Sequence, residues 1–124
     1  EAKTVEIVDV KPGKPETKWE REVKLVKYRR RIYCYKFLIE GSHTWQNFKV
    51  ASARLEFVEP DSNGNIVEPL YVKFDETEEK EMKELIASIW KKIKQLDLPD
   101  ISTYSQDYSG ILEFIHSMIP SKDN

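Results

Sequence analysis

The sequence TVEIVDVKPGK, residues 4–14, predicts a β-strand that runs into a tight turn. Apolar, β-branched residues recur along it, which is typical of a strand, and Pro12-Gly13 ends the strand. Because side chains two residues apart in a strand point to the same side, Asp9 and Lys11 should project together from its C-terminal end.

The Asp9–Lys11 pair has two interpretations. A carboxylate and an ammonium placed together can hold a metal ion and orient a phosphate or a water molecule. The alternative is an exposed surface ion pair, which is a common feature. The Asp-x-Lys pattern on its own favours the ion pair, so a functional interpretation depends on what else lies near these two residues.

The composition indicates one globular domain spanning residues 1–124. The 20 basic and 22 acidic residues leave a net charge of −2, so the global charge does not predict nucleic-acid binding. Cys34 is the single cysteine, which excludes an internal disulfide and a cysteine-based metal site and fits a reducing, cytoplasmic location. No segment is apolar enough to span a membrane, and the start is not a signal peptide. The chain begins almost directly in a strand without an initiator Met, which suggests a piece of a larger protein.

A long helix is expected over residues 17–40, followed by the helix-ending pair Gly41-Ser42. Its apolar residues form two stripes, whereas a surface helix needs one, so we expect this helix to be covered on two sides. The first stripe contains Leu25, Tyr28, Ile32, Tyr35 and Ile39, and the second contains Val23, Val26, Tyr33, Cys34 and Phe37.

An antiparallel hairpin is expected next, with strands at residues 48–59 and 66–74 around a turn at 60–65. Pro69 lies inside the second strand, which favours an edge position or a bulge. In the first strand, alternation predicts Ala51, Ala53, Leu55 and Phe57 on one side and Val50, Ser52, Arg54 and Glu56 on the other.

Two helices complete the chain. Asp75, with Glu78 three residues later, has the pattern of a helix N-terminus, and Leu98-Pro99-Asp100 ends that helix. A loop at 101–109 leads to a short helix at 109–118. The sequence thus predicts an α+β fold in the order strand, long helix, β-hairpin, helix, short helix. The first of the two final helices should pack through Met82, Leu85, Ile86, Ile89, Trp90, Ile93 and Leu96.

The other chemistry-bearing residues give one local signal. His43 and His116 form no recognisable catalytic arrangement, and the glycines are isolated. Residues 18–31, in contrast, hold seven Lys or Arg against two Glu. Lys24, Lys27 and Arg31 fall on one strip of the long helix, where they could contact phosphates; the alternative is a solvated or acid-paired strip.

Three segments, in this order, resemble the PD-(D/E)XK nuclease superfamily, and within it the RecB-like exonuclease domain at the C-terminus of UvrD-type superfamily 1 DNA helicases. IVDVKPGK is similar to that branch's strand ending Asp-Tyr-Lys-Thr-Gly. YRRRIYCYKFLIEG is similar to its Gln-x-x-x-Tyr helix. ARLEFVEPDSNG and IWKKIKQLDLPD are similar to its tail of a hairpin and a helix, so the likeness covers most of the chain.

The resemblance implies a partial restriction-endonuclease-like core and a set of roles. Asp9 would coordinate Mg²⁺, the backbone carbonyl of Val10 would be a further metal ligand, and Lys11 would orient the attacking water or stabilise phosphate charge. Tyr35 matches the tyrosine of the helix motif. Arg31 stands where the family carries Gln, a departure that bears on DNA positioning and on activity.

The resemblance also implies parts that this chain does not contain. The family has a helix with a Glu and a strand with another metal-binding Asp upstream of the Asp-x-Lys strand. We therefore expect the C-terminal part of a Mg²⁺-dependent DNA exonuclease domain of a helicase–nuclease, inactive when isolated. DNA and the helicase domains of the same parent chain would be its partners, and self-association of the piece is left open.

Two alternatives to a nuclease remain. The first is a degenerate nuclease fold that binds DNA or a protein without catalysis, which the Arg31 departure favours. The second is an unrelated α+β interaction domain in which Asp9 and Lys11 form an ordinary surface pair. In that case the long helix should lie far from Asp9.

Overall fold

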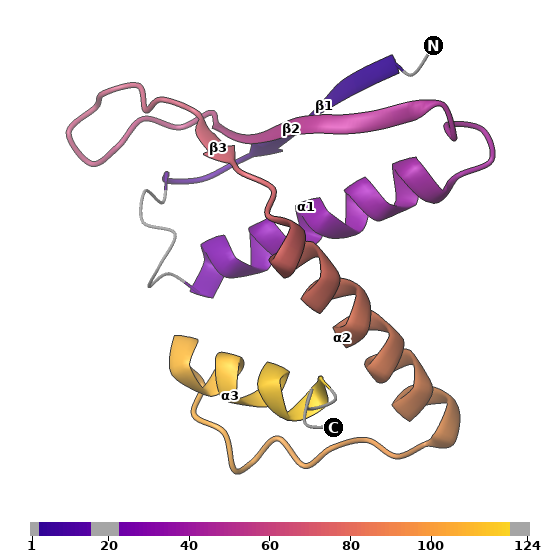
Figure 1. The fold of residues 1–124 in the computed structure, drawn as a ribbon. Coiled ribbons are helices and arrows are strands. Elements are labelled where there is room, and N and C mark those ends of the chain that lie inside the picture. Colours follow the sequence, from indigo (N-terminus) through magenta and orange to yellow (C-terminus); the bar gives the residue numbers. More distant parts are fainter. Residues whose placement is uncertain (1–2, 16–22, 120–124) are drawn as a thin grey trace. The chain divides into compact units, whose positions relative to one another are not determined.

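The computed structural model describes residues 3–15 and 23–119 and confirms the α+β class (Figure 1). It forms two compact units, Glu1–Phe74 and Asp75–Asn124. That they make up one domain stays a prediction. The elements are β1 (Lys3–Lys11), α1 (Val23–Gly41), β2 (Phe48–Phe57), β3 (Leu70–Val72), α2 (Glu76–Gln95) and α3 (Tyr108–Met118).

The first unit is a three-stranded mixed sheet in the order β1-β2-β3. β1 runs parallel to β2, from Lys3 opposite Phe48 to Lys11 opposite Phe57. Parallel neighbours cannot be joined by a tight turn, and the segment containing α1 supplies the long crossover that they need. β3 pairs antiparallel with β2, as the hairpin pattern predicted.

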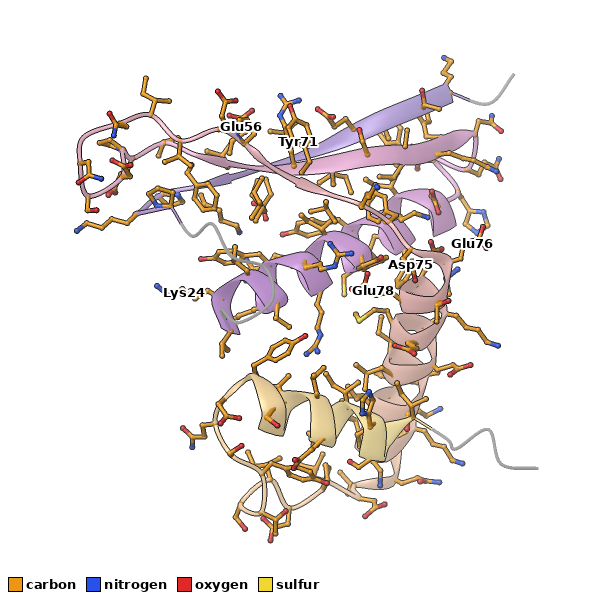
Figure 2. The ribbon with its side chains drawn as sticks, turned by 60° about the vertical axis from the view of Figure 1, so that its left-hand side comes forward. Lys24, Glu56, Tyr71, Asp75, Glu76 and Glu78 are labelled. Atoms are coloured by element: carbon orange, nitrogen blue, oxygen red, sulfur yellow. The ribbon has the colours of Figure 1, made fainter. Side chains whose placement is uncertain are left out.

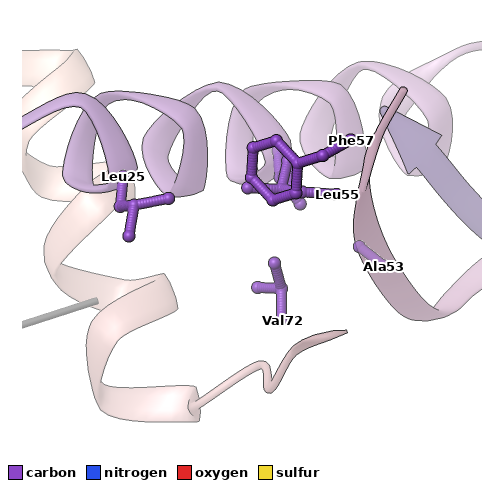
Figure 3. Close-up of a cluster of buried hydrophobic side chains, with 6 residues drawn as sticks. Leu25, Ala53, Leu55, Phe57 and Val72 are labelled. Atoms are coloured by element: carbon purple, nitrogen blue, oxygen red, sulfur yellow. The ribbon is translucent and has the colours of Figure 1, made fainter. Parts of the chain in front are cut away.

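The core of this unit lies between α1 and one face of the sheet (Figure 3). Leu25 and Ile32 come from the first apolar stripe of the helix and are fully buried. Leu55 is also fully buried, and the strands add Ala53, Phe57 and Val72. The helix therefore covers the sheet face to which Asp9 and Lys11 also belong, since β1 exposes its residues alternately.

The pairing of β1 with β2 contains an irregularity that corrects the predicted alternation. Val5 is opposite Val50, but Glu6 is opposite Ser52, so Ala51 is an extra residue on β2. A bulge of this kind shifts the side-chain parity by one residue. Val50 is consequently buried on the same side as Leu55, and Ala51 is exposed, the opposite of what strict alternation predicts.

A polar clamp fixes α1 to this irregular part of β2. The Lys36 Nζ atom lies 2.8 Å from Glu40 Oε2, and the other carboxylate oxygen of Glu40 accepts a hydrogen bond from the Val50 N–H at 3.0 Å. Lys36 is buried, with its ammonium 5.7 Å from the centre of the Phe74 ring. The clamp thus satisfies a strand amide beside the bulge from a helix side chain.

The second apolar stripe of α1 is only partly covered. Tyr33 is fully buried and stacks edge-on against Phe74, with the ring centres 5.3 Å apart. Val23, in contrast, is exposed. The predicted helix start at 17–22 lies outside the described residues.

The hairpin is shorter on its return side than predicted. β3 spans three residues, whereas the sequence predicted a strand over 66–74. Pro69 has no N–H for the ladder, and Ile66 is 94% exposed, so the segment before Leu70 stays outside the sheet. In the tip, the Asp61 carboxylate accepts the N–H groups of Asn63 and Asn65, and the Asn65 hydrogen bond is the main cause that lowers the pKa of Asp61.

The face of the sheet away from α1 carries an ionic cluster. Arg54 bonds to Glu6 across the strands and to Glu56 at 2.7 Å, and the Glu56 bond is the main cause that raises the pKa of Arg54. The Ser52 hydroxyl donates to Glu6 at 2.8 Å. Figure 2 shows Glu56 and Tyr71 on this outer side, so polar groups and one exposed aromatic ring lie opposite the core.

In the second unit, the start of α2 is capped as predicted. Asp75 Oδ1 accepts the N–H of Glu78 at 2.9 Å, and both residues are labelled in Figure 2. The helix ends at Gln95, where Leu96 takes a left-handed conformation with φ 55°. This end comes before the Leu98-Pro99-Asp100 segment that the sequence suggested.

The predicted packing stripe of α2 is buried only at its N-terminal end. Met82 and Leu85 are buried, but Ile86, Trp90 and Ile93 are exposed, Trp90 to 62%. Within this unit α2 packs on α3, which has 11 residues against the 20 of α2, so α3 is too short to cover the whole stripe. The expectation that the full stripe packs was therefore wrong for this unit.

At the N-terminus of α3, the backbone of Gly110 lies very close to the backbone of Ser105 in the preceding loop. Asp107 caps it by accepting the Gly110 N–H at 2.9 Å, which is the main cause that lowers the pKa of Asp107. A Cβ atom on Gly110 would lie 1.9 Å from the carbonyl oxygen of Ser105. Only glycine lets the preceding loop fold back onto this turn.

Candidate functional site

Asp9 and Lys11 form an ion pair at the C-terminal end of β1. Lys11 Nζ lies 2.8 Å from Asp9 Oδ2, and the two side chains are 9% and 15% exposed. Among the described residues, the Lys11 ammonium is the charged partner of the buried Asp9 Oδ2 atom. A carboxylate can accept several contacts, so this ion pair leaves Asp9 able to bind a further cation or donor.

The Lys11 ammonium contacts the ring of Tyr28 on α1. It lies 4.2 Å from the centre of the Tyr28 ring, a short cation–π distance, and Lys11 is buried. This pair is therefore not the exposed surface pair of the simpler interpretation. The sequence placed Tyr28 in an apolar stripe and gave no sign of its contact with Lys11.

Asp9 and Tyr35 line the same hollow of about 470 Å³ between β1 and α1. Residues 5–9 form one wall, Leu38 and Ile39 continue the helical wall, and Trp45 with Phe48 closes the end. The two aromatic rings at that end pack edge to face with centres 5.2 Å apart. The long helix thus lies beside Asp9 rather than far from it.

The backbone carbonyl of Val10, a predicted metal ligand, lies at the outer edge of the described sheet. Lys3 and Lys11 both bond toward β2, through Lys3 N–H to the Asn47 carbonyl at 2.9 Å and Val58 N–H to the Lys11 carbonyl at 3.3 Å. Residues of alternating parity in a strand direct their backbone groups to opposite edges. The Val10 carbonyl therefore points away from β2.

The basic strip of α1 is exposed along its described length. Lys24, Lys27 and Arg31 are all solvent-exposed, and Figure 2 shows Lys24 near the first described turn of the helix. Tyr35 follows Arg31 by one helical turn, so the cations lead along the helix toward the hollow. Lys18 and Arg21, which also contribute to the local basic run, lie outside the described residues.

The described residues do not by themselves form a metal site. Within residues 3–15 and 23–119, no three His, Cys, Asp or Glu side chains gather where they could hold a metal ion. Asp9 fits the role of one carboxylate ligand, because Mg²⁺ takes about six oxygens, several of them from water or phosphate. The remaining protein ligands would have to come from outside the described residues.

Comparison with known proteins returned no match to this chain from protein-family models, curated proteins or solved structures.

Proposed function

We propose that this chain is the C-terminal part of a Mg²⁺-dependent DNA exonuclease domain of a helicase–nuclease. The observation that carries the proposal is the Asp9–Lys11 pair at a strand end, beside a hollow that Asp9 shares with Tyr35. The order of motifs along the chain, from the Asp-x-Lys strand through the Arg-x-x-x-Tyr helix to the hairpin, supports it.

In this proposal each side chain has one task in phosphodiester hydrolysis. Asp9 would hold the metal through its carboxylate, and the Val10 carbonyl is a second candidate ligand. When bound, Mg²⁺ polarises the phosphate and activates a water molecule. Lys11, held by Asp9 and the Tyr28 ring, keeps a positive charge where the phosphate or the attacking water would lie. Tyr35 positions DNA from the wall of the hollow.

The proposed partners are DNA and the helicase domains of the same parent chain, in the cytoplasm. In the described part of the chain, no helix combines the length and apolar character needed to cross a bilayer. The isolated chain is expected to be inactive, since Asp9 is one metal ligand of several.

Cleavage by the complete parent protein tests the proposal. We expect Asp9→Ala to abolish Mg²⁺-dependent degradation of end-labelled DNA, because the metal loses its carboxylate. Lys11→Met, which keeps the aliphatic stem under Tyr28, should also abolish it. Asp61→Ala removes a carboxylate at the hairpin tip and should leave cleavage unchanged. Full cleavage by both Asp9→Ala and Lys11→Met would contradict the proposal.

A second candidate function is DNA binding without cleavage, which the exposed strip of Lys24, Lys27 and Arg31 favours. If each cation contacts one phosphate, then Lys27→Ala and Arg31→Ala should each reduce the slope of log K against log salt by about 0.7–0.9. Fluorescence anisotropy with labelled DNA at several salt concentrations measures this slope.

The control for the binding measurement is Lys49→Ala, since Lys49 is also exposed in the first unit but lies on β2. It should leave the slope unchanged. Equal slopes for Lys27→Ala, Arg31→Ala and wild type would show that the strip does not contact DNA. Metal-dependent cleavage by the complete protein would reject the non-catalytic alternative.

A further inference from the structure

The apolar stripe of α2 has the spacing of a contact between two helices. Its members follow one another at steps of four, three, four and three residues, and they are Met82, Ile86, Ile89, Ile93 and Leu96. This alternation is the a/d pattern of a coiled coil, in which each apolar side chain packs between residues of a facing helix. The spacing therefore indicates that another α-helix covers this stripe.

The C-terminal part of the stripe is open to solvent. Trp90 is 62% exposed, Ile93 is 47% exposed, and Leu96, the residue that follows α2, is 88% exposed. The other described helix of this unit, α3, does not cover them. Large apolar residues that are exposed together, unlike single scattered ones, mark an interaction surface.

The charges of α2 divide the helix into an acidic half and a basic half. Residues 76–84 hold five Glu and two Lys, a formal charge of −3, and residues 85–95 hold three Lys and no acidic residue, a formal charge of +3. Charges of this order at helix ends complement the helix macrodipole. Glu81, Glu84 and Lys91, however, lie outside the terminal turns, so the division extends along the helix.

The ion pairs of α2 do not cancel this division. Two of them join residues of the acidic half to each other, so they leave its net charge unchanged. In the basic half, the Lys92 ammonium lies 3.0 Å from the carboxylate of Asp97, which follows the helix. Asp97 offsets one of the three Lys charges, and the basic half stays positive.

We propose that α2 pairs antiparallel with α2 of a second copy of this chain. The acidic half of each helix then lies against the basic half of the other, and Ile86, Trp90 and Ile93 are buried between the helices. A parallel pair would instead place like charges together. An antiparallel pair has two-fold symmetry, so the same surface supplies both sides of the contact. The inference does not rest on the proposed nuclease function, because it uses α2 alone.

The oligomeric state of the 124-residue chain is the first test of this pairing. We expect sedimentation equilibrium to show a reversible equilibrium between one chain and two, shifting toward the dimer as the protein concentration rises. A chain that stays monomeric up to about 1 mM would overturn the proposal, whatever else covers the stripe.

A matched pair of substitutions locates the contact. Ile93→Glu places a carboxylate in the stripe and should weaken the dimer at least about tenfold. Ile66→Glu makes the same change at the 94% exposed residue of the hairpin tip and should leave the dimer unchanged. Circular dichroism checks that both variants fold. Equal dimerisation of the two variants would overturn the proposal.

Two charge variants test the orientation and leave the apolar stripe intact. Glu76→Lys with Glu81→Lys makes the acidic half positive, and Lys91→Glu with Lys94→Glu makes the basic half negative. Each variant alone should dimerise at least about tenfold more weakly than wild type, because like charges then face each other. An equal mixture of the two should dimerise as wild type does. Tighter dimerisation of either variant alone would indicate a parallel pair, and unchanged dimerisation of both would remove the charges from the contact; either result overturns the proposal.

Discussion

Gly110→Ala is expected to destabilise the α2–α3 unit by about 3 kcal/mol, the upper part of the range for overpacking. The added Cβ would lie 1.9 Å from the Ser105 carbonyl oxygen, which is backbone and cannot rotate away. The loop or the first turn of α3 must therefore move. That movement would also break the hydrogen bond from the Gly110 N–H to the Asp107 carboxylate.

Urea denaturation and amide exchange of α3 measure this effect. The matched control is Gly41→Ala at the end of α1, where a Cβ would meet nothing within 4 Å and φ is not in the left-handed region. It should change stability by less than about 0.5 kcal/mol. If Gly110→Ala were as stable as Gly41→Ala, the approach of the loop to α3 would be wrong.

Glu40→Ala is expected to destabilise the first unit by about 2–3 kcal/mol. Glu40 accepts from both the Lys36 ammonium and the Val50 N–H. Removing the carboxylate takes the 2.8 Å ion pair from the buried Lys36 ammonium and the acceptor from the Val50 N–H beside the bulge. The loss of stability should be largest where α1 packs on β2.

Two further variants separate the charge of the clamp from its hydrogen bond. Glu40→Gln keeps an oxygen that can accept from Val50 and should cost less than Glu40→Ala. Lys36→Met keeps the buried stem without the ammonium and should also cost less, because Glu40 is more exposed and can be solvated. Thermal unfolding ranks the three variants by their loss of stability. A larger loss of stability for Lys36→Met than for Glu40→Ala would contradict this account.

Local signals were sufficient for several parts of the fold. The Asp75 cap with Glu78, and the helix at 108–118, follow from interactions between residues close in sequence. The hairpin was predicted from its turn signals, and the edge position that Pro69 favoured is confirmed, because β3 is an edge strand of the described sheet. The apolar stripe of α2 was misleading, because periodicity shows which face is apolar but not how much of it finds a partner.

The sequence predicted that Asp9 and Lys11 lie together, but it did not predict all of the side chains that surround them. Strand alternation places Asp9 beside Lys11, and the structure finds them 2.8 Å apart. The nuclease resemblance placed the long helix near Asp9, and Tyr35 lines the same hollow as Asp9, but the Tyr28 ring over Lys11 had no signal in the sequence. Such contacts depend on the path of α1 over the sheet, which no local pattern contains.

By itself the sequence determined the α+β class, the approximate positions of the elements and the proximity of Asp9 to Lys11, because each follows from periodicity, caps or turns within a few residues. Only the tertiary structure decided that β1 pairs parallel with β2, that Ala51 shifts the parity of the strand, and that β1 is an edge strand of the described sheet. Strand pairing and register are set by which surfaces are buried together, and that balance is a property of the folded chain as a whole.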